Sequence, residues 1–484
     1  LSDVCSSYLD AATVTIRWMT ASTYQDAVDY LYSYIDYSLE RSYRYTADRF
    51  DLGRVRQLLR ALGDPQRSFR SLHIAGTKGK GSVSALTASA FQAGGYRTGL
   101  YTSPHLVDLT ERIRVDGEPI AAGELAALVD EIKPHVAPID GLTMFELLTA
   151  LGFLHFARQG VEWASIEVGL GGRLDATNVL EPVVSVITSL SYDHMHLLGN
   201  SLSDIAREKA GIIKPGVPVV LAPQQHEADR VVAEVAAEQG APLIRVGKEW
   251  HFAPGAHDLD SQSLYIWSAA EQPLMDEFVE TAGSEEWAPP RYEIPLLGFH
   301  QVINAAVAYA ALQAARQRGL AIDDPAIVEG FRSVDWPGRL QILCRDPLVL
   351  IDSAHNRDSA LRLRIALDDY FPGQPVTLVF GALADKDIPG MLVELLPRVS
   401  RLILTQADHP RAASPEELGA MARGHGWRVE TIVPVADALR WAIAHCRPGE
   451  VIVAAGSLTV AGEVLAAWDS IRASLPAVAQ GAST

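Results

Sequence analysis

From Ser71 onward, short apolar runs alternate with helical patterns, and this alternation most limits what the chain can fold into. Five runs in the first half are candidate strands, namely Leu72–Ala75, Thr98–Tyr101, Ala164–Val168, Val183–Thr188 and Val217–Leu221. Helical patterns lie between them. Strands that alternate with helices are typical of α/β proteins, so we predict a parallel-rich sheet in this half.

A second alternating series begins after Trp336. Its candidate strands are Leu348–Ile351, Val376–Phe380, Leu402–Thr405, Val429–Val433 and Val451–Ala455, each followed by a helical pattern. This series predicts a second, smaller, Rossmann-like α/β domain. Pro337-Gly338 is a linker signal, so we place the boundary near residue 335 and expect domains at 23–334 and 335–484.

One stretch interrupts the rhythm of strands and helices. Residues 251–290 are polar, acidic and contain aromatic residues, which indicates a β-rich excursion or an insertion at a sheet edge.

Composition restricts the class of partner. The chain has 41 Lys and Arg against 59 Asp and Glu, a formal net charge of −18, and no basic block. These features argue against nucleic acid or an anionic membrane as the main partner. We find no run of 18 uncharged apolar residues, so a transmembrane span is not expected.

The ends and the cysteines point to a cytoplasmic protein. Cys5, Cys344 and Cys446 are odd in number and scattered, which fits neither a disulfide framework nor a zinc site. Residues 1–22 lack the features of a signal peptide, and we expect them to be a non-native or disordered extension. Met19 is a plausible natural start before the amphipathic run Tyr24–Leu31.

A loop rich in glycine and lysine follows the first strand. It comprises Gly76, Thr77, Lys78, Gly79, Lys80, Gly81 and Ser82. The spacing differs from the common P-loop, because Gly81 separates Lys80 from the hydroxyl residue. The physical requirements are nevertheless met, since glycines let the backbone approach phosphates and the following helix directs its N-terminus at an anion. The alternative is an ordinary strand-to-helix turn with surface lysines.

Further polar clusters follow other strands, at the sheet edge where ligands gather in open α/β folds. Ser103, Glu146 and His194 form a mixed oxygen and nitrogen set that suits Mg²⁺ if they converge. Taken singly, Glu146 is better explained as a charge at a helix start and His194 as a structural histidine. The group Asp352–Asn356 follows the first strand of the second series, and turn chemistry also explains it.

Eight segments together carry a family resemblance. They are AGTKGKGS, YTSPHL, the Glu of TMFE, EVGLGGRLDATN, DH followed by LLGNSLSDIAREKAGIIK, GFHQVINA, WPGR and DSAHN, in this order. Across residues 23 to 470 the chain resembles folylpolyglutamate synthases and the bifunctional dihydrofolate synthase/folylpolyglutamate synthases of the Mur-ligase superfamily. The resemblance implies a two-domain, ATP-dependent carboxylate–amine ligase that adds L-glutamate to folates, and we expect dihydropteroate to be a second substrate.

The resemblance also implies roles for residues. It places ATP on Gly76 to Ser82, with Lys80 near the transferred phosphate, and further nucleotide contacts at Asn304, Arg339 and Asp352. It assigns metal ligation, with two Mg²⁺ ions, to Ser103, Glu146 and His194. Lys209 matches a lysine that is carbamylated in the family, and His355 matches a residue of the second domain that faces the active site.

Two departures from the family pattern are visible. Lys78 stands where bacterial members usually carry Asn, as in eukaryotic folylpolyglutamate synthases, and residues 251–290 match no family segment. Two rival hypotheses remain: a Mur-type ligase of cell-wall precursors, and a non-catalytic ATP-binding regulator. We expect a monomer that acts on small molecules in the cytoplasm.

Overall fold

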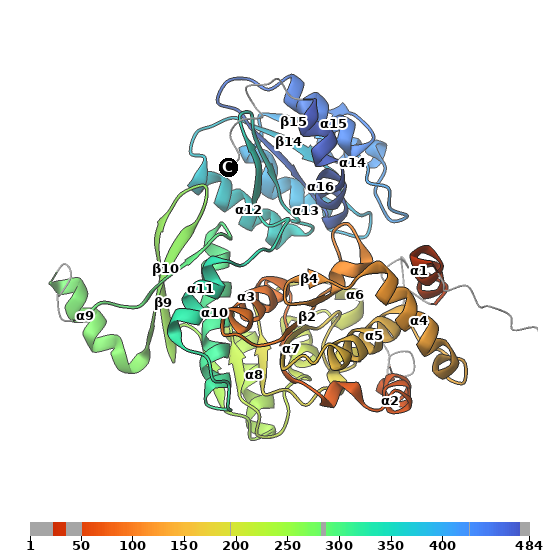
Figure 1. Ribbon diagram of the computed structural model, residues 1–484. Coiled ribbons are helices and arrows are strands. Elements are labelled where there is room, and N and C mark those ends of the chain that lie inside the picture. The colour runs from red at the N-terminus through yellow and green to blue at the C-terminus, as the bar shows by residue number, and fades with distance from the viewer. Residues whose placement is uncertain (1–22, 35–50, 194, 282–286, 425, 475–484) are drawn as a thin grey trace, which may run out of the picture.

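The computed structural model describes residues 23–34, 51–193, 195–281, 287–424 and 426–474 (Figure 1). The predicted extension at 1–22 and the predicted metal ligand His194 lie outside these residues. Two separate α/β units are visible, with the C-terminal unit above the N-terminal one in Figure 1. Within the described residues, no helix is long and apolar enough to cross a membrane.

The N-terminal unit is built on an eight-stranded sheet with the order β4-β3-β2-β5-β1-β6-β7-β8. The strands from β2 to β8 in this order are parallel, and β3 and β4 add an antiparallel edge. Their bounds are β1 Arg70–Ala75, β2 Thr98–Tyr101, β3 Ile113–Val115, β4 Glu118–Pro119, β5 Trp163–Glu167, β6 Val184–Ile187, β7 Val219–Leu221 and β8 Leu243–Arg245.

Helices cover both faces of this sheet because its strands carry apolar side chains on both sides. In β7, Val220 faces one core cluster while Val219 and Leu221 face another. The helices are α1 Tyr24–Tyr32, α2 Leu52–Ala61, α3 Lys80–Ala93, α4 Ala122–Val136, α5 Met144–Arg158, α6 Met195–Leu198, α7 Leu202–Ala210, α8 His226–Glu238, α10 Phe299–Arg316 and α11 Asp324–Arg332.

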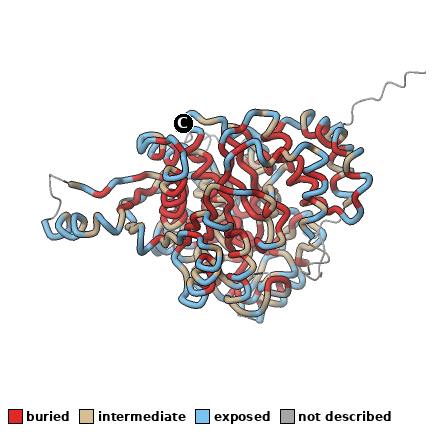
Figure 2. Tube along the Cα trace, turned by 90° about the horizontal axis from the view of Figure 1, so that it is seen from below, coloured by how far each residue is buried: buried red, intermediate tan, exposed pale blue. Residues whose placement is uncertain are grey.

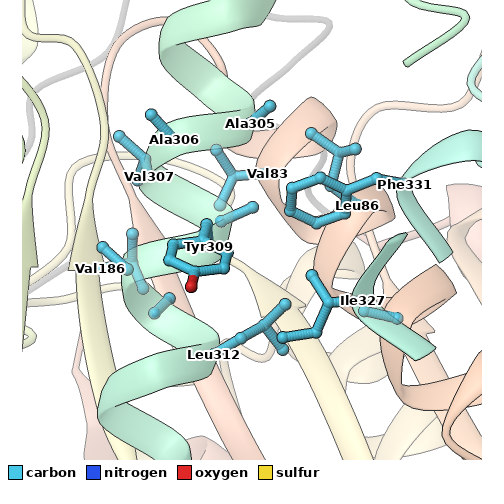
Figure 3. Packing of buried hydrophobic residues seen from close by; sticks show 14 of the residues in the cluster. Val83, Leu86, Val186, Ala305, Ala306, Val307, Tyr309, Leu312, Ile327 and Phe331 are labelled. Carbon is cyan, nitrogen blue, oxygen red and sulfur yellow. The ribbon is translucent and has the colours of Figure 1, made fainter. Parts of the chain in front are cut away.

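The largest core lies between this sheet and helices α3, α10 and α11. Val83 and Leu86 of α3, Leu312 of α10 and Phe331 of α11 are fully buried in it (Figure 3). The run of alanines in α10 lets that helix lie close to its neighbours, since small side chains permit close packing. The loop that begins α3 is therefore attached to a rigid body.

The predicted excursion is indeed rich in β-structure. Strands β9 Trp250–His257, β10 Gln262–Ser268 and β11 Arg291–Ile294 form an antiparallel sheet with the order β11-β10-β9. The sequence did not indicate helix α9 Gln272–Glu280, which follows β10, buries no residue and projects from the body (Figure 2).

The C-terminal unit contains a six-stranded sheet with the order β12-β13-β17-β14-β15-β16, of which only β12 is antiparallel. The strands are β12 Gln341–Arg345, β13 Leu348–Ile351, β14 Val376–Phe380, β15 Arg401–Leu404, β16 Glu430–Thr431 and β17 Val451–Ala455. The helices are α12 Arg357–Tyr370, α13 Ile388–Leu395, α14 Pro415–Gly424, α15 Val435–Ala444 and α16 Leu458–Ala473.

Most predicted strands lie within one or two residues of the observed ones. The predicted run Val429–Val433 is shortened at both ends, so that only Glu430 and Thr431 are in a strand, and both are exposed. This strand forms the edge of its sheet, where few ladder bonds are needed, and Pro434 follows without an amide donor. The chain passes from the first unit to the second between α11 and β12, and the boundary near residue 335 stays a proposal.

Candidate active site

A cleft of about 850 Å³ lies between the carboxyl ends of the strands of the two sheets. Every predicted site residue within the described part of the chain lines it: Gly76, Thr77, Lys78, Gly79, Lys80, Gly81, Ser82, Ser103, Glu146, Lys209, Asn304, Arg339, Asp352 and His355. These residues come from seven separate stretches of sequence. The fold therefore brings together what the sequence left scattered.

The glycine-rich loop connects β1 directly to α3. Gly79 has a φ of +89° and precedes the first residue of the helix, Lys80. A Cβ atom at Gly79 would lie 2.2 Å from Oδ1 of Asn304 in α10, so a side chain fits neither the backbone conformation nor the space. The loop thus presents backbone amides and the positive end of a 14-residue helix to the cleft, an arrangement that binds anions.

Lys80 faces a buried carboxylate. Its Nζ lies 3.7 Å from Oε1 of Glu167, the last residue of β5. Oε2 of Glu167 accepts a hydrogen bond of 3.2 Å from the backbone amide of Ser103. Burial raises the pKa of Glu167, and the charge of Lys80 counteracts this rise. Glu167 therefore links the glycine-rich loop to the loop that follows β2.

Lys209 lies beneath the same loop. The lysine is only 5% exposed, in the last turn of α7, and its Nζ donates a hydrogen bond of 2.9 Å to the carbonyl oxygen of Gly76. Burial, assisted by the charge of Lys80, lowers the pKa of Lys209 to about 7. The predicted helix from Ser201 is α7, and Ser201 caps it. A large fraction of this amine is therefore neutral near neutral pH.

Glu146 is buried at the start of α5, where Thr143 and Glu146 form a capping box. Its Oε2 accepts a hydrogen bond of 2.8 Å from the amide of Thr143, and its Oε1 lies 3.4 Å from Nε of Arg54. Burial raises the pKa of Glu146, although Arg54 opposes the rise. The alternative interpretation of Glu146 as a charge at a helix start is thus correct, and the residue also lines the cleft.

Only two of the three predicted metal ligands belong to the described residues. Ser103 and Glu146 both line the cleft, while His194 lies outside the described residues. Among the described residues, no group of three His, Cys, Asp or Glu side chains could hold a metal ion. A serine hydroxyl and a carboxylate are oxygen donors of the kind that Mg²⁺ accepts, so the residues present fit a hard cation.

The second unit contributes the opposite wall of the cleft. Asp352, at the end of β13, accepts hydrogen bonds of 2.8 Å from the amides of Leu340 and Ala354, which hold the linker that carries Arg339. Nε2 of His355 lies 3.1 Å from Nζ of Lys78. Burial and the nearby Lys78 hold the pKa of His355 well below its usual value, so the imidazole is neutral.

Asp193, which precedes the undescribed His194, connects the two units. It lies 3.0 Å from Nζ of Lys78 and 3.5 Å from Nζ of Lys386, and it accepts a hydrogen bond of 2.7 Å from Asn356. Lys386 and Asn356 belong to the C-terminal unit. Lys78 therefore lies at the contact between the units.

Sequence reasoning did not assign roles to four cleft residues, Arg54, Glu167, Asp193 and Lys386. Glu167 and Asp193 stood in the segments EVGLGG and DH, one at the end of a strand and the other in the loop after the next strand, which was the available signal. Arg54 lies in residues 50–65, a stretch expected to contact the pteroate, but no pattern singled out Arg54 itself. No pattern marked Lys386, because its partner is distant in sequence.

The cleft retains polar atoms for a ligand. Oγ of Ser353 and Nε of Arg411 are buried, and neither has a hydrogen-bond partner in the part of the chain that the structure describes. Buried polar atoms without partners are costly, and a bound ligand would satisfy them.

None of the described residues that line the cleft comes from 251–290, so the excursion contributes no wall to it.

Comparison with known proteins decides the family. The family model "Mur ligase middle domain" matches residues 74–312, and "Mur ligase, glutamate ligase domain" matches residues 338–458. The dihydrofolate synthase/folylpolyglutamate synthase of Bacillus subtilis is 36% identical over 404 residues, which cover 82% of this chain and 88% of the relative. The chain belongs to the dihydrofolate synthase/folylpolyglutamate synthase family of Mur ligases.

Solved structures agree with this family. The structure of Escherichia coli FolC in complex with DHPP and ADP has a TM-score of 0.79 and 32% identity, and the match covers 93% of this chain and 99% of FolC. The bifunctional enzyme of Yersinia pestis, complexed with AMPPNP and a Mn ion, has a TM-score of 0.78 and 29% identity over 93% of this chain and 98% of that enzyme. The predicted family, two-unit α/β fold and ligase class are confirmed, and the alternatives of a cell-wall ligase and a regulator are not favoured.

Proposed function

We propose that the protein uses ATP and a divalent metal to join L-glutamate to the carboxylate of folates and of dihydropteroate. The observation that carries this proposal is a cleft in which the glycine-rich loop 76–82, Glu146 and Lys209 of one unit face Asp352 and His355 of the other. The complexes of relatives with ADP, AMPPNP and a Mn ion support the nucleotide and the metal.

The chemistry explains why such a site needs a phosphate loop. A carboxylate resists attack by an amine, and its oxide is a poor leaving group. Transfer of the γ-phosphoryl group from ATP to the substrate carboxylate gives an acyl phosphate and ADP. The amine of L-glutamate then attacks the acyl carbon, and phosphate leaves as the amide forms.

Lys80 and the loop amides act on the phosphates. Lys80 is held in the cleft by Glu167 at 3.7 Å, so its charge is already positioned when ATP arrives. Preorganised positive groups stabilise the charge that shifts during phosphoryl transfer. Arg339 and Asp352 approach from the linker and the second unit, and we assign them to the nucleotide together with Asn304.

Ser103 and Glu146 would hold a divalent metal, with His194 as the third predicted ligand. When bound, such a metal offsets the negative charge of the nucleotide and of the incoming carboxylate. We propose two Mg²⁺ ions, and we assign a carbamylated Lys209 to the second. This charge compensation explains how a chain with a net charge of −18 can bind two anions.

A product assay tests the proposal. Purified protein is incubated with ATP, Mg²⁺ and L-glutamate, with dihydropteroate or tetrahydrofolate offered separately, and the products are weighed by mass spectrometry. We expect a glutamate-sized increment on both substrates. An increment on tetrahydrofolate alone would contradict the bifunctional assignment, and no increment on either would contradict the proposed function.

A further inference from the structure

The two carboxylate oxygens of Glu146 face different partners. Oε2 belongs to the capping box of α5 through its hydrogen bond with the amide of Thr143. Oε1 is turned toward Nε of Arg54 at 3.4 Å, and both side chains are largely buried, with 18% exposure for Arg54 and 8% for Glu146. Oε1 takes no part in the helix cap, so a metal that binds this oxygen leaves the cap intact and lies on the side where the guanidinium lies.

Arg54 is held on a well-anchored helix. Asp51 caps α2 by accepting a hydrogen bond from the amide of Gly53, and Val55, Leu58 and Leu59 are fully buried in the core that α2 shares with α5. The backbone of α2 is thus fixed relative to Glu146. The long side chain of Arg54, which lines the cleft, is the part that can reorient.

A divalent metal and a guanidinium cannot both lie beside Oε1 at low cost. Two cations within a few ångströms repel strongly in a partly buried cleft, where water screens them poorly. When a metal binds Oε1, Arg54 must therefore move away. Its planar group remains at the cleft wall, where a substrate carboxylate is the complementary partner for its two-pronged geometry.

We propose that Arg54 exchanges partners: it neutralises Glu146 in the metal-free protein, and it binds a carboxylate of the pteroate or folate substrate once a metal occupies Oε1. The inference rests on the proposed function, because it takes Glu146 as a metal ligand. If Arg54 exchanges partners in this way, the anionic substrate binds after the metal, because only then is the guanidinium released from Glu146.

The first test measures metal affinity directly. Full-length protein is titrated with Mn²⁺ alone, and free Mn²⁺ is followed by electron paramagnetic resonance. We expect Arg54→Gln to bind Mn²⁺ at least about fivefold more tightly than the unmodified protein, because a competing cation is removed. Arg56→Gln is the matched control, since it removes the same charge from an exposed position of α2, and it should leave the affinity within about twofold.

Whether Mn²⁺ affinity rises or falls in Arg54→Gln distinguishes this inference from a purely structural ion pair between Arg54 and Glu146. If Arg54 only positions Glu146, its loss would weaken Mn²⁺ binding or leave it unchanged, and either result overturns the proposal. Glu146→Gln should abolish the tighter binding when combined with Arg54→Gln. If the double variant binds as tightly as Arg54→Gln alone, Glu146 is not the metal ligand and the proposal fails.

A second readout follows the substrate. Arg54→Gln should raise the KM for dihydropteroate about tenfold with a smaller change in kcat. Arg54→Lys keeps the charge but not the two-pronged geometry, so its KM should lie between those of the unmodified protein and Arg54→Gln. Arg54→Lys also serves if Arg54→Gln does not fold, and its Mn²⁺ affinity should then stay near that of the unmodified protein. An unchanged KM in both variants contradicts the exchange. Ligation by the unmodified protein in the same preparation separates failure of this inference from failure of the proposed function.

Discussion

Nζ of Lys209 lies 2.9 Å from the carbonyl oxygen of Gly76, which places a buried amine directly under the phosphate loop. A protonated lysine at this position would repel both Lys80 and a bound cation. The lowered pKa of about 7 leaves much of the amine neutral, and only a neutral amine can react with CO₂ to form a carbamate.

Carbamylation of Lys209 should therefore depend on pH. We expect a carbamate signal in the ¹³C NMR spectrum of protein equilibrated with ¹³CO₂, and the signal should decline as the pH falls below about 7, since the amine then binds a proton. Lys209→Ala should lack the signal. Lys214→Ala should keep it, although burial lowers the pKa of Lys214 to about 8, because Lys214 is hydrogen-bonded to Asn178 instead of lining the cleft. An unmodified Lys209 in active, CO₂-equilibrated protein would defeat the assignment.

Lys209→Ala should also lose most ligase activity. The substitution removes the ligand that a carbamate would supply, and added short-chain carboxylic acids should restore part of the activity by filling the vacant position. Product formation measured with and without acetate tests this. Rescue in Lys80→Ala by the same acids would show that the effect is not specific to Lys209.

Lys80→Ala should leave the protein folded while ligase turnover falls by at least about 10²-fold, because the lysine acts on transition-state charge and not on a core. The side chain lies at the cleft, and its loss removes one ion pair with Glu167. Circular dichroism and the mass-spectrometric product assay measure the two quantities. Turnover close to that of the unmodified protein would refute the role of the loop lysine.

Glu146→Gln separates the structural role of this residue from its chemical one. Glutamine can serve at the third position of a capping box, so the helix cap of α5 should survive and the melting temperature should change by only about 2 °C. Activity should nevertheless be lost, because a neutral amide lacks the negative charge with which the carboxylate attracts a divalent cation. A large drop in melting temperature would indicate that the carboxylate matters mainly for the fold.

Domain closure should require Arg339. The linker residues around Arg339 are held by Asp352, and the two units already meet at Asp193. We expect small-angle scattering to show compaction on addition of an ATP analogue with folate, and we expect Arg339→Ala to reduce activity. Full activity in Arg339→Ala together with no compaction in the unmodified protein would contradict this.

The β9–β10 hairpin forms a second contact between the units, away from the cleft. The hydroxyl of Tyr370 in α12 donates to Oε1 of Gln262 at 3.2 Å and accepts from the amide of Gly298 at 3.2 Å, and Arg345 pairs with Asp260. Tyr370→Phe should lower the free energy of unfolding by about 1–3 kcal/mol, because a buried amide and an amide oxygen lose their partner. Thermal unfolding measures this, with Tyr265→Phe of β10 as a control expected to change little.

The sequence alone determined the succession of elements and the family. Apolar runs such as Val376–Phe380 are buried strands because the length and pattern of a run are local properties, and eight ordered motifs are read without any structure. The arm α9 escaped this reasoning, and the predicted strand Val429–Val433 is longer than the observed edge strand β16, since neither α9 nor β16 buries the apolar face from which a pattern is recognised.

Only the tertiary structure decided which residues meet. Arg54 and Glu146 are 92 positions apart, and Lys78 and His355 are 277 apart, and nothing local in the chain records either contact. Arg54 meets Glu146 because α2 packs against α5. Lys78 meets His355 because each follows a parallel strand, and the carboxyl edges of the two sheets face each other across the cleft. The motifs therefore identified the types of functional side chain. The contacts of these side chains, the distances between them and their pKa values depend on how the chain packs.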